Sequence, residues 1–194
     1  MAQQDDKRPY RATPGQMRAL ASPVRIEIVG VFQSYGALAI RELAEKLSRP
    51  MDGLYHHVRL LQKVGIVRVA RTRRVGKRDE SVYELTAERF GHQASPQTAA
   101  MKRTIVETAT AALRLAGREF ERAILLHERS NELNRPAESK LSRQKSWLTE
   151  ADLTKLHRML NKIESFLQKR LHRKEGQPFA LTTVLVPLLK RKRV

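Results

Sequence analysis

The chain has no cysteine among its 194 residues. This absence excludes disulfide bonds, thiolate metal sites, cysteine redox switches and cysteine nucleophiles, and it agrees with a reducing compartment. Six histidines are scattered along the sequence, and none forms a zinc-binding spacing with carboxylates. The sequence also lacks a glycine-rich phosphate loop and a nucleophile elbow. It therefore predicts a protein that is not an enzyme and that carries no metal or other cofactor.

Long apolar runs are also absent. The longest, Leu181–Leu189, is interrupted by two threonines and a proline, and it falls short of the about 18–20 apolar residues that span a bilayer. Residues 1–15 are polar and charged, without the apolar core of a signal peptide. From these features we expect a cytoplasmic location and no membrane partner.

Aromatic and acidic residues are scarce. Aromatics make up 5% of the chain and hydrophobic residues 41%, so the core must consist mainly of Leu, Ile, Val and Ala. The 38 Lys and Arg residues outnumber the 20 Asp and Glu residues, giving a net charge of +18. Such a charge favours a polyanionic partner, either nucleic acid or an anionic membrane surface. A basic, highly soluble protein without such a partner is the alternative.

The excess of positive charge is spread over both halves of the chain. Residues 1–90 carry 17 basic and 10 acidic side chains, and residues 91–194 carry 21 and 10. The C-terminal half is therefore also a candidate for contact with DNA or with an acidic partner.

The first half of the chain shows a series of short helices. Residues 1–13 have the composition of a disordered tail. Proline is tolerated in the first turn of a helix, serine is a frequent N-cap, and glycine often follows a helix end. These signals and the apolar spacing predict helices over Pro14–Leu20, Pro23–Ser34, Arg41–Leu47 and Pro50–Val64, with a small strand over Ala37–Ile40 and a turn at Ser48-Arg49.

A β-hairpin is expected to follow these helices. Residues Ile66–Arg73 and Ser81–Leu85 alternate between apolar and polar side chains, which is typical of strands. The polar segment Arg74–Glu80 between them is centred on Gly76. It predicts a connecting loop longer than two residues.

After a linker at His92–Gln97, the apolar residues recur every three or four positions over long stretches, which predicts long helices. One apolar stripe falls within Met101–Ile124 and a second within Leu153–Leu171, with Thr149 and Asp152 placed as a capping box before the second. Phe179–Val186 is rich in Thr and Val and predicts a strand. Trp147 would either line an effector pocket or anchor the start of the second long helix. Residues 190–194 form a basic tail.

Three blocks within residues 16–86 are similar to the ArsR-like winged helix-turn-helix transcriptional regulators of bacteria. The blocks are Leu20-Ala21-Ser22-Pro23-Val24-Arg25-Ile26, Ile40-Arg41-Glu42-Leu43-Ala44-Glu45-Lys46-Leu47 and Leu54-Tyr55-His56-His57-Val58-Arg59-Leu60-Leu61-Gln62-Lys63-Val64-Gly65-Ile66-Val67. Metal-sensing members carry a cysteine pair in the helix before the turn, where this chain has Leu38-Ala39-Ile40-Arg41. The resemblance implies a winged helix-turn-helix domain over residues 14–90 and does not support thiolate metal sensing.

The fold class predicted is therefore mainly α with a small β wing. An N-terminal winged helix-turn-helix domain would be followed by a helical dimerisation or effector region over residues 97–189, ending in a strand. On the recognition helix, the DNA-contacting face would carry Met51, Asp52, Tyr55, His56 and Arg59. A solvated helix surface is the alternative for this face, and Asp52 would then only stabilise the helix N-terminus. His57 lies nearer the buried side and is interpreted as a packing residue.

Cations on the hairpin would contact phosphate or the minor groove. The residues concerned are Arg71, Arg73, Arg74, Lys77 and Arg78. A solvated loop is again the alternative.

Together these features predict a regulator of transcription, of repressor type, that binds double-stranded DNA. It would read a palindromic operator as a homodimer, through surfaces on Met101–Ile124 and Leu153–Leu171. A purely intramolecular helical hairpin is the alternative to the dimer. A winged-helix module that binds RNA or a protein partner is the alternative to the function. The sequence does not specify an effector.

Overall fold

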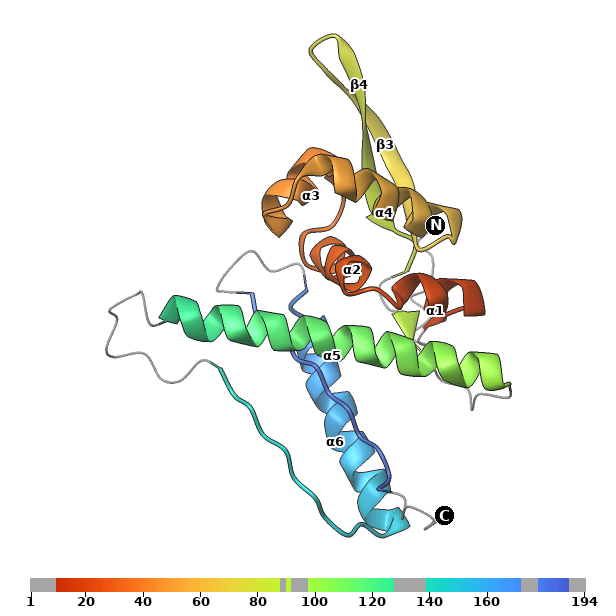
Figure 1. The fold of residues 1–194 in the computed structure, drawn as a ribbon, viewed down its shortest axis with the longest axis vertical. Helices are drawn as coiled ribbons and strands as arrows, with labels where there is room; N and C mark the ends of the chain where they lie inside the picture. Colours follow the sequence, from red (N-terminus) through yellow and green to blue (C-terminus); the bar gives the residue numbers. More distant parts are fainter. Residues whose placement is uncertain (1–9, 88–89, 92–97, 128–138, 172–177, 189–194) are drawn as a thin grey trace.

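The computed structural model describes residues 10–87, 90–91, 98–127, 139–171 and 178–188 (Figure 1). The described residues are mainly helical, with a small antiparallel sheet, as predicted from the sequence. The helices are α1 (Pro14–Leu20), α2 (Pro23–Tyr35), α3 (Ile40–Leu47), α4 (Met51–Lys63), α5 (Ala99–His127) and α6 (Glu150–Gln168).

The folded chain uses some of the local signals that predict the helices, although Ser22 at the N-cap of α2 makes no side-chain capping hydrogen bond. The Thr13 hydroxyl accepts a hydrogen bond from the Gln16 amide at 3.2 Å, and the Gln16 side chain accepts one from the Thr13 amide at 2.8 Å. This capping box, followed by Pro14, starts α1. Gly65 follows α4 with a φ of 72°, a conformation that glycine adopts without steric cost. Pro50 is the N-cap of α4, so this helix begins one residue later than expected.

Three strands form the small sheet, in the order β2 (Leu38–Ala39), β4 (Arg78–Leu85) and β3 (Val67–Val75), and all neighbours are antiparallel. The hairpin of β3 and β4 is the wing, and it projects away from α5 at the top of Figure 1. A two-residue parallel pair, β1 (Tyr10–Arg11) with β5 (Phe90–Gly91), was not predicted.

The predicted long loop at the end of the wing is wrong. The ladder continues through the pairs Arg73–Glu80, Arg74–Asp79 and Val75–Arg78, so the turn consists only of Gly76 and Lys77. Gly76 has a φ of 62°, and a two-residue hairpin turn needs positive φ at its first central position. The polar residues on either side of the turn belong to the strands, which makes the wing longer and narrower than expected.

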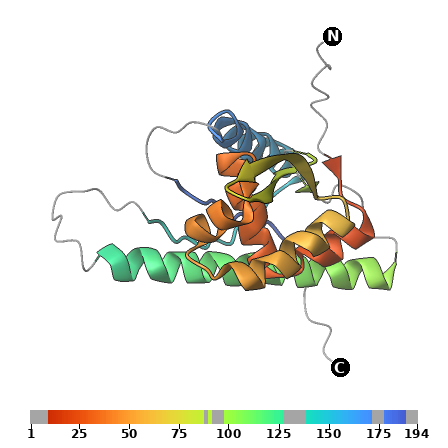
Figure 2. The same ribbon diagram turned by 90° about the horizontal axis from the view of Figure 1, so that it is seen from above.

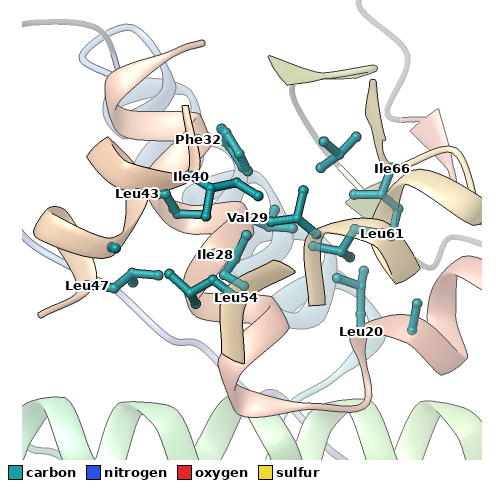
Figure 3. Packing of buried hydrophobic residues seen from close by; sticks show 14 residues of the cluster. Leu20, Ile28, Val29, Phe32, Ile40, Leu43, Leu47, Leu54, Leu61 and Ile66 are labelled. Carbon is teal, nitrogen blue, oxygen red and sulfur yellow. The ribbon is translucent and has the colours of Figure 1, made fainter. Parts of the chain in front are cut away.

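The core lies between α2, α3, α4 and the base of the wing (Figure 3). Its fully buried members come from every one of these elements, and helical or alternating spacing brings them to the inner face. The largest of them are Ile28, Leu43, Leu54, Val58, Leu61, Ile66, Val67 and Val82.

Helix α5 runs across α1 and α2 on the side opposite the wing (Figure 1). Its buried positions are Thr104, Ala111 and Leu115, and the Thr108 hydroxyl donates to the backbone oxygen of Met17 at 3.1 Å. The predicted stripe lies at the edge of this contact, because several of its positions follow the buried ones by one residue. Most of its members are half-buried, namely Met101, Ile105, Ala112, Ala116 and Phe120, whereas Ala109 and Ile124 are exposed.

Helix α6 begins with the predicted capping box, in which the Asp152 amide donates to the Thr149 hydroxyl at 3.2 Å. None of the described residues of α6 is buried, and the helix does not pack along α5 in the described part of the chain. Within the described ranges, the two long helices therefore do not form the intramolecular hairpin. No helix within the described ranges has the length and apolar character needed to cross a membrane.

Two expectations for the C-terminal region are wrong. Residues 178–188, which are described, have no regular secondary structure, so the strand expected over Phe179–Val186 is not formed. A strand needs a hydrogen-bonding partner, and among the described residues none lies beside this segment. Trp147 is 99% exposed, so it neither lines a pocket nor anchors α6.

Candidate nucleic-acid interface

Helix α4 separates its apolar and polar side chains onto two faces. Leu54, Val58 and Leu61 are at most 1% exposed and point into the core. The five predicted contact residues of α4 are all exposed, and they comprise Met51, Asp52, Tyr55, His56 and Arg59. The face of α4 that points away from the core is therefore mainly polar, and Arg59, Tyr55 and His56 are available to a partner together with Lys63 one turn later.

His57 lies between the two faces and is half-buried. Its pKa is lowered, first by burial and then by the nearby positive charges of Arg25, His56 and Arg49. Its Nδ1 atom is buried and has no hydrogen-bond partner among the described residues. Burial and the nearby positive charges favour the neutral ring. The half-buried position agrees with the interpretation of His57 as a packing residue, but the unpaired Nδ1 atom shows that the ring is not fully satisfied within the described part of the chain.

The turn between α3 and α4 is fixed by an ion pair that the sequence pattern did not predict. Arg49 in the turn donates to the Glu27 carboxylate of α2 at 2.9 Å, and the Glu27 side chain is only 12% exposed. Ser48 before it adopts a left-handed conformation with a φ of 50°. A partner in another helix, 22 residues earlier, cannot be recognised from local spacing.

Four of the five predicted wing cations are exposed. Arg71 lies on β3 where the ladder register shifts between Val69 and Arg71, and Lys77 is in the turn. Arg74 and Arg78 flank the turn, and Arg74 comes within 4.0 Å of Asp79. An ion pair this exposed is weak. These side chains can therefore exchange their present surroundings for a phosphate.

Arg73 has different surroundings from those predicted. Its guanidinium lies 2.7 Å from the Glu80 carboxylate across the wing and 2.9 Å from the Glu42 carboxylate of α3. The pKa of Arg73 is raised, first by the hydrogen bond to Glu80 and then by the one to Glu42. Arg73 is held inside an ion-pair network, so it is not a free cation at the tip of the wing.

Helix α4 and the wing lie at the same end of the molecule, away from α6 (Figure 1), and Figure 2 looks onto this end from above. Contacts between α4 and β3 hold the two elements next to each other. A helix of this kind fits the major groove of DNA, and cations beside it can reach the phosphate backbone. Among the described residues, no group of three or more His, Asp or Glu side chains could hold a metal ion.

A family model described as a helix-turn-helix domain matches residues 20–70. This chain contains a helix-turn-helix domain. The match to the helix-turn-helix domain runs from the end of α1 through α4 and into β3, so it includes the turn and the exposed face of α4. It does not cover β4, α5 or α6, and it does not distinguish the ArsR-like regulators from other helix-turn-helix proteins. No curated protein matches the chain.

Proposed function

We propose that the protein is a DNA-binding transcriptional regulator of the ArsR-like winged type. The observation that carries this proposal is the pairing of an exposed polar face on α4 with a wing of exposed cations, within a helix-turn-helix domain. The net charge of +18 supports a polyanionic partner. Such a protein would act in the cytoplasm and as a repressor, as the resemblance to the family implies.

Helix α4 would read bases in the major groove. Arg59 can bind the O6 and N7 atoms of guanine together, and Tyr55 can meet a thymine methyl group or donate to phosphate. His56 would donate to a phosphate. Asp52, near the helix start, would accept from cytosine N4. Met51 completes the face at its N-terminal end.

The wing would contact the backbone beside the groove. Arg71, Arg74, Lys77 and Arg78 are exposed along the projecting hairpin. Contacts of this kind add affinity and fix the position of the domain without reading sequence.

We further propose that two copies bind a palindromic operator as a homodimer. The apolar residues of α6 recur at alternating steps of three and four, which is the spacing of a two-stranded coiled coil, over Leu153, Leu156, Leu160, Ile163 and Leu167. All of them are at least partly exposed, so this seam is available to a second chain. The half-buried side of α5 would add to the interface. One recognition helix per half-site then follows from two-fold symmetry.

The test is selection of bound fragments from the organism's own genome by the purified full chain, followed by sequencing. We expect a symmetric motif with half-sites about one helical turn apart. Competition with unrelated RNA serves as the control. Retention of RNA in place of DNA, or enrichment of fragments without a symmetric motif, would contradict the proposal and favour a winged-helix module for RNA or protein.

Replacing Arg59 with Ala is expected to reduce sequence discrimination. Without a bidentate hydrogen bond to guanine, binding weakens by about 1–3 kcal/mol on the selected operator and much less on unrelated DNA. The measurement is the ratio of the two dissociation constants at one salt concentration. Arg158→Ala removes an exposed arginine from α6 and is the matched control. An equal loss on both DNA molecules would assign Arg59 to phosphate.

Replacing Lys77 and Arg78 together with Gln is expected to weaken binding to all DNA sequences by a similar factor. Removal of each cation that neutralises a phosphate should flatten the slope of log K against log salt by about 0.9. The measurement is a salt titration of operator and unrelated DNA. Lys155→Gln with Arg158→Gln changes the net charge equally on α6 and should leave the slope close to that of the unaltered protein. A loss confined to the operator would show that the wing reads bases.

A further inference from the structure

We infer that Arg73 and Glu42 form a strut that sets the angle of the wing relative to the helix-turn-helix, so that both are positioning residues for DNA binding. The inference rests on the proposed function and goes beyond it, because it gives Arg73 a role other than contact with DNA.

Glu42 joins two parts of the domain through its two carboxylate oxygens. Oε2 accepts a hydrogen bond from the Ala39 amide at 2.7 Å, which caps the start of α3. Oε1 accepts from Nη2 of Arg73 in the wing at 2.9 Å. The pKa of Glu42 is lowered, first by the Ala39 hydrogen bond and also by Arg73 and Arg41. The side chain is therefore ionised at pH 7 and bound at both ends.

Arg73 joins Glu42 to the second strand of the wing. Its Nε donates to Oε2 of Glu80 at 2.9 Å, and Glu80 is its cross-strand neighbour in the ladder. The three side chains are 25–32% exposed, whereas the flanking Arg74 is 72% exposed. The partial burial distinguishes this network from the other ion pairs of the wing and favours a structural role.

The position of Arg73 along β3 makes the strut effective. Arg73 lies two positions beyond Arg71, whose partner Val82 is the last β4 residue that also pairs with β2, so Arg73 is about 7 Å along the strand from the three-stranded base of the wing. A two-stranded ribbon held only at its base would swing and twist easily. A contact with α3 just where the two-stranded ribbon leaves the three-stranded base restricts that movement, and the tip with Lys77 lies only a few residues beyond.

The direction in which DNA affinity changes on removal of the Glu42 charge distinguishes the strut from a purely electrostatic role. Two carboxylates surround one guanidinium, so the network repels DNA if its members act only through their charge. Removing the charge of Glu42 would then strengthen DNA binding. The strut predicts the opposite. Ala39 and Arg73 donate to different oxygens of Glu42, and Gln replaces one of these oxygens with an NH₂ donor, so one of the two hydrogen bonds is lost.

The first measurement uses the full chain without DNA. Because the chain has no cysteine, spin labels can be attached only at the introduced pair Val75→Cys on the wing and Lys63→Cys on α4, both of which are exposed positions. We expect a narrow distribution of label-to-label distances that broadens in Glu42→Gln and in Arg73→Gln. Glu45→Gln removes the same charge from an exposed position of α3 and should leave it narrow. Unchanged widths in both network variants would overturn the inference.

The second measurement is affinity for the selected operator with the unlabelled variants. Coupled residues in one network typically interact strongly enough to change affinity about three- to tenfold, so each single variant should weaken binding by that factor. The double variant should bind no more weakly than Arg73→Gln alone. Tighter binding by Glu42→Gln would overturn the strut. If the unaltered protein binds no DNA, the proposed function fails, and the distance measurement still decides whether the strut exists.

Discussion

Replacing Leu160 and Ile163 of α6 with Asp is expected to convert the protein to a monomer and to lower its affinity for the operator about 100-fold or more. The two residues lie in the middle of the heptad stripe, and neither is buried within the chain. Carboxylates at these positions would be desolvated in a coiled-coil seam, which prevents pairing. A monomer loses the second half-site, and the avidity supplied by linked binding is typically 10²–10⁴-fold.

The control for this experiment is Asn161→Asp with Ser165→Asp. Both positions are exposed on the other face of α6, so the pair adds the same charge without entering the stripe. Sedimentation equilibrium gives the molecular mass, and titration of a full operator and a half-site gives the affinities. Affinity for the half-site should change only slightly, and by a similar amount, in both double variants. A dimer that persists in Leu160→Asp with Ile163→Asp would exclude α6 as the interface and leave α5.

Leu61→Ala is expected to lower the free energy of unfolding by about 2–5 kcal/mol. Leu61 is fully buried on the inner face of α4, near Val29 of α2 and Ile66 just before β3 (Figure 3). Truncation removes apolar contacts and leaves a cavity that the surrounding helices fill only in part. Urea unfolding followed by circular dichroism measures the change, under conditions in which DNA is absent.

Met51→Ala provides the comparison on the same helix. Met51 is 43% exposed, and a surface substitution of this kind usually changes stability by no more than about 0.5 kcal/mol. The two variants should therefore differ strongly in stability, whereas Met51→Ala should affect only DNA affinity. A loss below about 1 kcal/mol for Leu61→Ala would contradict the placement of this face of α4 in the core.

The helical part of the fold could be predicted because its signals are local. The spacing of Leu54, Val58 and Leu61 defines the inner face of α4, and that face in turn exposes Tyr55 and Arg59. Capping residues and glycines add start and stop signals within a few positions. Exposure of the α4 face follows from this pattern, whereas contact of these residues with DNA remains a prediction.

The errors fall where a structure depends on a distant or missing partner. Charged residues near Gly76 resemble a loop in sequence, yet Arg73 and Glu80 face each other as an ion pair that extends the ladder. The Val-rich segment after Phe179 has the composition of a strand but no neighbouring strand among the described residues. The second partner of Arg73, Glu42, is 31 residues away, and no periodicity could have indicated it.

Glu27 connects the helix-turn-helix domain with α5 through ion pairs next to the turn before α4. Its carboxylate holds Arg49, just before the recognition helix, and it also lies 3.9 Å from Arg122 of α5. The Glu27 carboxylate thus interacts with the turn before the recognition helix α4 and with α5, which belongs to the region proposed to form the dimer. A displacement of α5 that brought Arg122 closer to Glu27 would compete with the ion pair between Glu27 and Arg49, which fixes the turn. If α5 contributes to the proposed dimer interface, a change there would act electrostatically on the turn before α4 through Glu27.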